Sequence, residues 1–159
     1  MQRKKKSFEQ ALQRAEELCS IQEKCSADIR IKCKQWGLGE ENTKNIIQSL
    51  VSNKFIDEER YSKAFMKDKI RFNKWGKNKI RYTLLQKKIK EAIIEKALDE
   101  IDEKAYNAMI YEELYKKMKS IKNIDEQGTK DKLIRFGISR GYDNGKVFDT
   151  VKLLIANKF

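Results

Sequence analysis

Three stretches of the chain carry apolar residues at positions i, i+1 and i+4, with charged or polar residues between them. This spacing places the apolar side chains on one stripe of a helix, so each stretch predicts an amphipathic helix with one face buried. The three stripes are Ile46, Ile47, Leu50 and Val51; Ile93, Ile94, Ala97, Leu98 and Ile101; and Val147, Phe148, Val151, Leu154 and Ile155.

A shorter basic helix is predicted before each stripe, and a single apolar residue joins the two helices. The joint residues are Leu38, Ile89 and Tyr142, which are 51 and 53 residues apart. A period near 50 residues indicates stacked supersecondary units that are each too small to bury a core alone. The three basic helices are expected at residues 29–36, 80–88 and 133–140.

Each unit also opens with a longer helix, so we expect nine helices in three tandem three-helix units and an all-α fold. Proline is absent and only seven glycines occur, which agrees with this class. Gly137 is the one glycine expected inside a helix, and the others are expected at joints. The apolar residues of the opening helices are Phe8, Ala11, Leu12, Ala15 and Leu18; Tyr61, Ala64 and Phe65; and Ala105, Met109 and Leu114. The expected boundaries are a basic tail at 1–6 and repeats at 7–55, 56–101 and 102–159.

The charge balance predicts a polyanionic partner. The chain has 36 basic and 24 acidic residues among 159, a formal net charge of +12. Nucleic acid, an acidic protein surface or an anionic membrane all fit this excess, although solvated helix faces are also often charged. No stretch has the roughly 20 apolar residues that a bilayer span requires, and no apolar run follows the basic residues 3–6. We therefore expect a cytoplasmic protein without a membrane partner.

Enzymatic and metal-binding functions are not expected. The chain has no histidine, the most common general base, and no glycine-rich phosphate loop. Cys19, Cys25 and Cys33 are too few for a four-thiolate zinc site and form no Cys-x-x-Cys pair. We expect them to be small buried hydrophobic residues on helices, and we expect the protein to need no cofactor.

One helix start carries a family resemblance. In residues 56–65, IDEERYSKAF, Asp57 is placed to cap a helix while Tyr61 and Phe65 face inward. This string resembles the central signature of the bacterial RecX regulatory proteins, and residues 76–89 resemble the second conserved helix of that family. Residues 33–38 resemble the corresponding helix end in the first unit. The signature residues, expected to be mainly structural, are Asp57, Tyr61, Phe65, Gly76, Ile80, Leu84 and Ile89.

The chain departs from the family pattern at three helix ends. Lys77 replaces a frequent proline, and Lys88-Ile89 lacks the glycine that usually stands between these two residues. Cys25 occupies a position that is usually Ser or Thr, and Ser26 is an alternative helix cap. These changes concern helix ends and leave the resemblance standing.

The resemblance implies a function. Proteins of this family lie in the helical groove of the RecA filament and block its recombinase, ATPase and coprotease activities. It therefore implies an elongated, curved arrangement of the helices, a non-enzymatic monomer that modulates RecA, and RecA–DNA filaments as partners. A basic helical-repeat protein that binds nucleic acid independently of RecA is the competing hypothesis.

The segment 63–90 is the candidate binding surface. It holds eleven basic residues and one acid, Asp68, for a local net charge of +10. Ordinary helical surfaces mix the two signs, so this excess favours binding either to phosphates of DNA, including single strands, or to acidic side chains of RecA. The candidates for contact are Lys63, Lys67, Lys69, Arg71, Lys74, Trp75, Lys77, Lys79, Arg81, Lys87 and Lys88.

Three aromatic residues are interleaved with these cations. Aromatic side chains can stack on unpaired bases, but they can equally fill a core between helices. We expect Phe72 and Tyr82 to belong to the core, and both interpretations stay open for Trp75.

Overall fold

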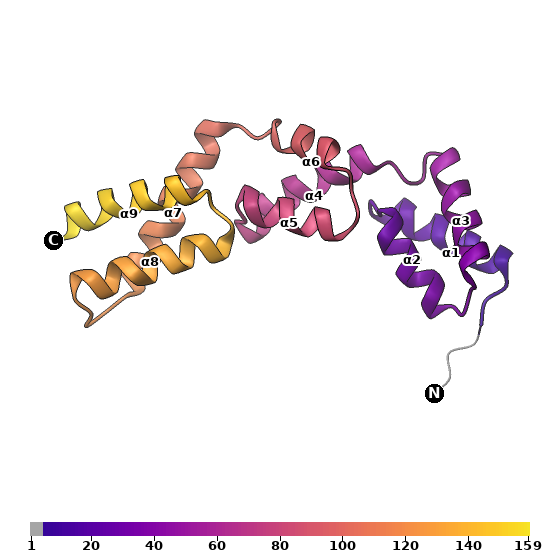
Figure 1. Ribbon diagram of the computed structural model, residues 1–159, viewed down its shortest axis with the longest axis horizontal. Coiled ribbons are helices and arrows are strands. Elements are labelled where there is room, and N and C mark those ends of the chain that lie inside the picture. Colours follow the sequence, from indigo (N-terminus) through magenta and orange to yellow (C-terminus); the bar gives the residue numbers. More distant parts are fainter. Residues whose placement is uncertain (1–4) are drawn as a thin grey trace. The chain divides into compact units, whose positions relative to one another are not determined.

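The computed structural model describes residues 5–159, so the first four positions of the predicted basic tail lie outside the described residues. Within residues 5–159 the chain forms nine helices and no strand (Figure 1). The all-α prediction is therefore confirmed. The helices are α1 (Phe8–Ile21), α2 (Ser26–Gln35), α3 (Glu40–Ser52), α4 (Glu58–Asn73), α5 (Lys77–Gln86), α6 (Glu91–Leu98), α7 (Glu103–Ser120), α8 (Glu126–Arg140) and α9 (Asn144–Lys158).

The tertiary contacts divide the chain into two compact units. The first unit comprises Met1–Phe65 and Leu84–Ile94, and the second comprises Met66–Thr83 and Glu95–Phe159. Residues of the predicted middle repeat, 56–101, are thus shared between the two units. Each unit has its own apolar core.

The core of the first unit is formed by one face of each of α1, α2 and α3. Ala11 and Ala15 of α1 are fully buried, and their small side chains let the other helices approach closely. Ser7 and Gln10 form a capping box that fixes the start of α1. Val51 was predicted on the buried stripe of α3 but is exposed. The buried side chains are Ala11, Ala15, Ile29, Cys33, Ile46, Ile47, Leu50 and Ile56.

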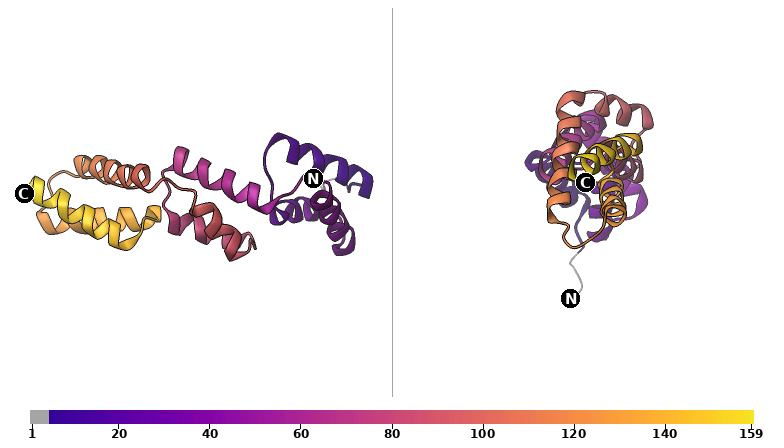
Figure 2. Two further views of the ribbon diagram at one scale, coloured as in Figure 1. Left: turned by 90° about the horizontal axis from the view of Figure 1, so that it is seen from above. Right: turned by 90° about the vertical axis from the view of Figure 1, so that its left-hand side faces the viewer.

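In the second unit, α7, α8 and α9 pack against one another (Figure 1, Figure 2). Gly137 lies inside α8 as predicted, and a Cβ atom there would stand 2.9 Å from both methyl carbons of Val147. The glycine therefore permits the close approach of α8 and α9. The buried side chains are Tyr106, Ile110, Leu114, Met118, Ile121, Leu133, Tyr142, Val147, Val151, Leu154 and Ile155.

Two glycines and two apolar residues of the three-helix part of this unit lie elsewhere than predicted. Gly128 and Gly145, expected at joints, lie in the first turns of α8 and α9. Ala105 and Phe148, expected on buried stripes, are exposed. In α7 the buried residues are instead Tyr106, Ile110, Leu114 and Met118, whose i, i+4 spacing defines a stripe one position further along the helix.

The three predicted joints share one backbone geometry. Each joint residue follows a residue with positive φ: Gly37 at 80°, Lys88 at 64° and Gly141 at 89°. The joint amides of Leu38, Ile89 and Tyr142 donate to carbonyls five residues earlier, at 3.0, 3.3 and 3.1 Å. This left-handed turn ends the helix and satisfies one of its last carbonyls. The period read from the sequence therefore reflects a repeated helix end.

Candidate nucleic-acid interface

In the second unit, the predicted binding segment consists of the end of α4, a turn at residues 74–76 and most of α5. Lys67 and Arg71 are exposed on α4, four residues apart and so on one face, and half-buried Lys74 begins the turn. None of these three side chains forms an ion pair with a described residue, so their charges are available to an anionic partner. We call Lys67, Lys69, Arg71, Lys74, Trp75 and Lys79 the basic surface of residues 66–83.

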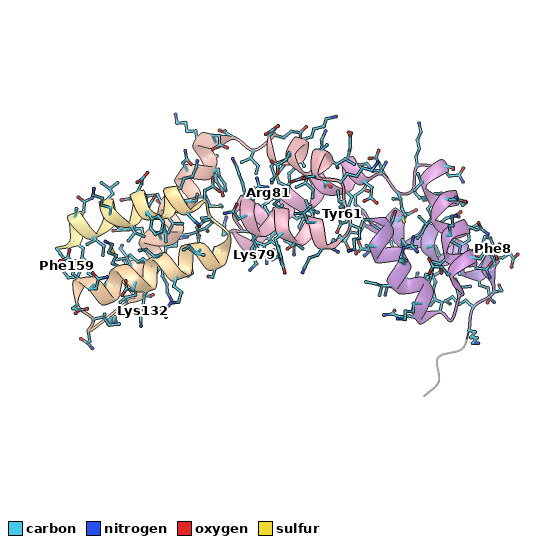
Figure 3. The ribbon with its side chains drawn as sticks, viewed as in Figure 1. Phe8, Tyr61, Lys79, Arg81, Lys132 and Phe159 are labelled. Carbon is cyan, nitrogen blue, oxygen red and sulfur yellow. The ribbon has the colours of Figure 1, made fainter. Side chains whose placement is uncertain are left out.

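Trp75 is half-buried and lies between two lysines. The Nζ atoms of Lys69 and Lys79 stand 4.8 and 4.5 Å from the centre of its indole ring. An ammonium group at this distance from an aromatic ring is attracted by its negative face. The contacts place two cations and a partly accessible aromatic ring in one cluster. The Lys79 side chain comes from α5 (Figure 3).

Phe72 and Tyr82 do not belong to the core, so that prediction was wrong. Their exposed fractions are 69% and 62%. Phe72 lies in the last turn of α4, seven residues after Phe65 and so on the same side of the helix, and its exposure is not explained by angular position. Tyr82 is two residues from both Ile80 and Leu84, which are fully buried, and is therefore on the far side of its helix. For Tyr82 the spacing in the sequence already contained this signal.

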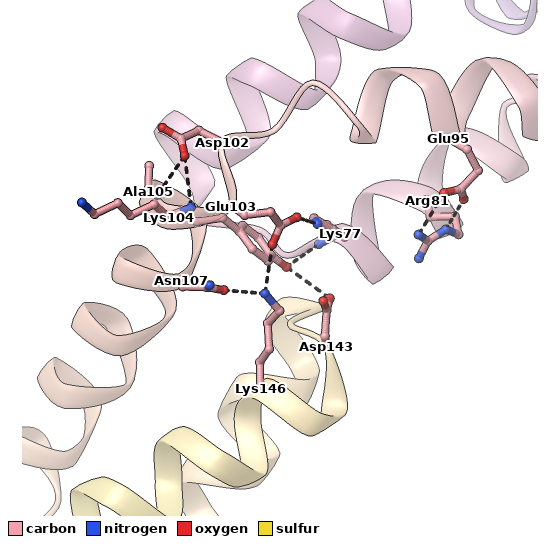
Figure 4. A network of polar contacts seen from close by, with 11 residues as sticks. Lys77, Arg81, Glu95, Asp102, Glu103, Lys104, Ala105, Asn107, Asp143 and Lys146 are labelled. Atoms are coloured by element: carbon pink, nitrogen blue, oxygen red, sulfur yellow. Dashed lines mark hydrogen bonds and ion pairs between the residues drawn. The ribbon is translucent and has the colours of Figure 1, made fainter.

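The ammonium group of Lys77 is paired within the chain. It forms an ion pair with Glu103 at the start of α7, and Lys146 of α9 binds the other oxygen of that carboxylate at 3.0 Å (Figure 4). Lys146 also donates to the side chain of Asn107. The hydrogen bonds from Lys77 and Lys146 lower the pKa of Glu103.

Arg81 is likewise paired. Its guanidinium donates to Glu95 of α6, at 2.6 Å through Nε and 3.3 Å through Nη2 (Figure 4). It also donates to the Asn78 side chain at 3.0 Å. Two guanidinium nitrogens bind the two oxygens of one carboxylate, and the hydrogen bond from Arg81 lowers the pKa of Glu95. Lys77 and Arg81 therefore link helices and are less available to a partner than Lys67 or Arg71.

The start of α5 has no acidic cap and is satisfied instead by the end of α8. The amides of Gly76 and Asn78 donate to the carbonyls of Arg140 and Gly141, at 2.7 and 2.9 Å. The amide of Lys77 donates to the hydroxyl of Tyr106 at 2.9 Å. The first free amides of one helix thus bind the last free carbonyls of another and a buried tyrosine.

The hydroxyl of Tyr142 fixes the turn from the other side. It donates to the carbonyl of Lys74 at 2.7 Å, and burial raises the pKa of Tyr142 to about 12. Tyr142 is fully buried, so this hydrogen bond is shielded from water. The turn that carries Trp75 is consequently tied to the helix end at Gly141.

The remaining candidates of the basic segment lie in the first unit. Lys87 binds Asp28 at 2.7 Å, and its Nζ stands 5.8 Å from the ring of Tyr61. Burial raises the pKa of Asp28, but the hydrogen bonds from Lys87 and from the Cys25 amide outweigh it, and the net shift is downward. Lys88 is exposed, whereas Lys63 is half-buried and has a partner within the chain.

The structure places the signature residues at helix starts and among buried side chains. Asp57 accepts a hydrogen bond from the Arg60 amide at 3.0 Å and so caps α4. Phe65 is half-buried, with its ring centre 5.9 Å from that of Tyr61. Sequence reasoning gave no role to the Arg60 side chain, which binds Glu23 at 2.5 Å and the carbonyl of Lys54 at 3.0 Å. The buried signature residues are Tyr61, Gly76, Ile80, Leu84 and Ile89.

The cysteines and the helix cap at residue 25 gave a mixed outcome. Cys25 and Cys33 are buried as predicted, while Cys19 is half-buried. Burial raises the pKa of the Cys25 thiol to about 11, so the thiol stays protonated. Cys25 occupies the N-cap position of α2, and Ser26, the alternative cap, is the first residue of α2.

In the part of the chain that the structure describes, no helix is long and apolar enough to cross a membrane.

Comparison with known proteins identifies the family. A model of the second three-helix domain of RecX matches residues 57–98. The regulatory protein RecX of Prosthecochloris aestuarii is 30% identical over 149 residues, which cover 92% of this chain and 95% of that protein. The chain belongs to the RecX family. The RecX protein of Clostridium botulinum is 32% identical over 131 residues, but the match spans only 61% of its length and 81% of this chain.

Two crystal structures of RecX proteins share the fold. One, a regulatory protein RecX, has a TM-score of 0.78 at 22% identity, with 91% of this chain and 73% of that chain covered. The other, RecX from Lactobacillus salivarius, has a TM-score of 0.77 at 16% identity, with 92% and 96% covered. At these identities the likeness supports the all-helical fold of this RecX-family chain.

Proposed function

We propose that this chain is a non-enzymatic regulator of the RecA recombinase that binds RecA–DNA filaments and restrains recombination, ATPase and coprotease activity. Membership of the RecX family, whose relatives are named regulatory proteins, is the observation that carries this proposal. The chain retains the structural signature of the family, from the Asp57 cap to the buried Ile89.

The electrostatics of the second unit support a filament as the partner. Lys67, Arg71 and Lys74 carry charges that no described acid neutralises. A filament of protein and DNA presents phosphates and acidic side chains together, and a surface of this kind binds either of them. The proposal therefore places the basic surface of residues 66–83 against the filament.

The roles that the polar side chains already have support the non-enzymatic part of the proposal. Asp57, Asp102 and Asp125 cap helices, and Glu95 and Glu103 bind arginine or lysine. The chain also has no histidine to serve as a general base near neutral pH. These groups hold the helices in place and leave regulation by binding as the function proposed.

The deciding experiment measures RecA-catalysed ATP hydrolysis on single-stranded DNA while the chain is titrated in. We expect hydrolysis to fall, and we expect the chain to bind RecA-coated DNA more tightly than bare DNA of the same sequence. Unchanged hydrolysis, together with equal or tighter binding to bare DNA, would refute the proposal. That outcome would favour a basic helical protein that binds nucleic acid independently of RecA.

A further inference from the structure

The indole of Trp75 is carried by a turn whose backbone is fixed on both sides. The Trp75 amide donates to the carbonyl of Lys69 at 3.1 Å, and the preceding carbonyl, of Lys74, accepts from the Tyr142 hydroxyl at 2.7 Å. The following amide, of Gly76, donates to the backbone carbonyl of Arg140 at 2.7 Å. A partly accessible aromatic ring in a fixed position loses little conformational freedom when a partner stacks on it.

Two ammonium groups converge on this ring. The Nζ atoms of Lys69 and Lys79 are both within 5 Å of the indole centre, at 4.8 and 4.5 Å. An anion placed beside the ring would be attracted by both ammonium groups. Phosphate oxygens form strong charge-assisted hydrogen bonds with such ammonium groups. Both ammonium groups lie over the ring, so a base that stacks there takes the place of an ammonium group, which then turns to an adjacent phosphate.

Exposed aromatic rings occur on both helices that flank the turn. Phe72 of α4 and Tyr82 of α5 are 69% and 62% exposed, so burial in the core does not explain them. The guanidinium of Arg71 lies 5.2 Å from the centre of the Phe72 ring, which repeats the pairing of cation and aromatic ring seen at Trp75. Alternating cations and aromatic rings characterise surfaces that bind single-stranded nucleic acid.

We propose that Trp75 is a stacking platform for an unpaired base of single-stranded nucleic acid, with Lys69 and Lys79 binding the phosphates on either side of that base. Single strands fit better than duplex, because the faces of bases in a duplex are covered by their neighbours. The inference rests on the proposed function, since the strand in question is the one that RecA coats.

The test follows the fluorescence of Trp75 alone. The chain has two tryptophans, so Trp36→Phe leaves Trp75 as the only indole. This variant is titrated at low salt with an oligothymidylate, with an abasic deoxyribose-phosphate oligomer of equal length, and with polyglutamate. We expect strong quenching by the oligothymidylate and much weaker changes with the other two. Equal quenching by the abasic oligomer, or no quenching by any of the three, would overturn the proposal.

Substitution at Trp75 provides the second measurement. Trp75→Ala is expected to weaken binding of the oligothymidylate about 5- to 150-fold, the range associated with loss of one base–aromatic stack. Trp75→Phe, which keeps a ring, is expected to retain most of the affinity. Circular dichroism confirms that each variant is folded. Unchanged affinity in a folded Trp75→Ala variant would contradict base stacking.

The phosphate contacts have a matched control in the same compact unit. The pair Lys69→Gln and Lys79→Gln is compared with Lys130→Gln and Lys132→Gln, which remove the same charge from exposed positions of α8. We expect the first pair to flatten the salt dependence of single-strand binding by about 0.7 in log–log slope for each lysine, and the control pair to leave it unchanged. Equal slopes in the two variants would contradict phosphate binding by Lys69 and Lys79.

These outcomes separate the stacking site from the regulation of RecA. If the chain inhibits RecA but Trp75 is not quenched by single strands, the stacking proposal is wrong and the proposed function stands. If Trp75 is quenched as expected but RecA activity and filament binding are unaffected, the stacking site stands and the proposed function is wrong.

Discussion

Gly76 and Gly141 approach each other so closely that a Cβ atom on Gly76 would stand 2.2 Å from the carbonyl oxygen of Gly141. The contact joins the turn before α5 to the end of α8, where the Asn78 amide donates to the same carbonyl at 2.9 Å. Gly141 also has a φ of 89°, and a Cβ atom there would lie 2.3 Å from the Cβ of Lys79. Both glycines are therefore required by the geometry, which gives a physical reason for Gly76 in the family signature.

Gly76→Ala is expected to destabilise the second unit by about 3 kcal/mol or more. The added methyl group meets backbone atoms, which cannot rotate away, so the cost should reach at least the upper end of the usual range for overpacking. Urea unfolding followed by circular dichroism measures the change. Gly145→Ala is the control, because nothing lies within 4 Å of its added Cβ and alanine favours the first turn of α9. A loss below about 1 kcal/mol for Gly76→Ala would contradict the close contact.

Lys88→Gly is expected to stabilise the chain by about 0.5–1 kcal/mol. Lys88 has a φ of 64°, whereas the two equivalent joints carry glycine. A side chain in the left-handed region costs about 1–2 kcal/mol of stability. Replacing it by glycine removes this cost, but the greater flexibility of glycine in the unfolded chain offsets part of the stabilisation. The urea midpoint should rise for Lys88→Gly and should not rise for Lys88→Ala, which removes the same charge but keeps a Cβ. Equal midpoints for the two variants would show that the backbone at this joint is not strained.

The helices could be predicted from the sequence because their buried faces are set by local spacing. Apart from exposed Val51 and Phe148, the stripes of α3 and α9 followed from the periodicity of apolar residues alone, as did the joints at Ile89 and Tyr142.

The same geometry places Tyr82 outside the core, two residues from both Ile80 and Leu84. It does not account for Phe72, which shares the side of α4 that carries Tyr61 and Phe65 but is exposed in the last turn.

The pairing of the cations could not be read from the sequence. Lys77 binds Glu103, 26 residues away, and Arg81 binds Glu95, 14 residues away, so neither pair follows the i, i+4 rule of a single helix. Only the packing of α5 against other helices brings these groups together. Eleven basic residues in one segment therefore looked equivalent, although the structure separates paired from unpaired charges.

The stability of the first unit is expected to depend on the ionisation of Asp28 at acid pH. Its pKa is lowered on folding, so its contribution is present above the ordinary value of 3.8 and is lost as the pH falls through the folded-state pKa. Unfolding free energies of wild type and Asp28→Asn, measured from pH 6 to pH 2.5, should differ most at pH 6. The difference should shrink below about pH 4.

Glu41→Gln is the control for this measurement, since it removes an exposed carboxylate from the first turn of α3 in the same compact unit. The control should follow the wild-type dependence more closely than Asp28→Asn does. A gap between wild type and Asp28→Asn that stays constant from pH 6 to pH 2.5 would show that the Lys87–Asp28 pair does not couple ionisation to folding.

Reversing the unpaired cations of α4 and its turn is expected to weaken binding without unfolding the chain. The triple variant Lys67→Glu, Arg71→Glu and Lys74→Glu changes side chains that form no ion pair with described residues, and glutamate is also a good helix former. The helical circular dichroism signal should be nearly unchanged, while inhibition of RecA ATP hydrolysis should fall sharply. Lys77 and Arg81 are left in place, because their loss would disturb the ion pairs with Glu103 and Glu95.

The matched control reverses three lysines elsewhere in the second unit, Lys122, Lys130 and Lys132, which are exposed. Both variants change the net charge by the same amount, so a difference between them reports position rather than total charge. If the first set contacts phosphates, the slope of log affinity against log salt for bare single strands should flatten by about 0.7 per lost contact. If the first set contacts acidic side chains of RecA, filament binding should weaken while that slope stays the same. Equal loss of inhibition in the two folded variants would mean that residues 66–83 have no special role and that only the overall positive charge draws the chain to the filament.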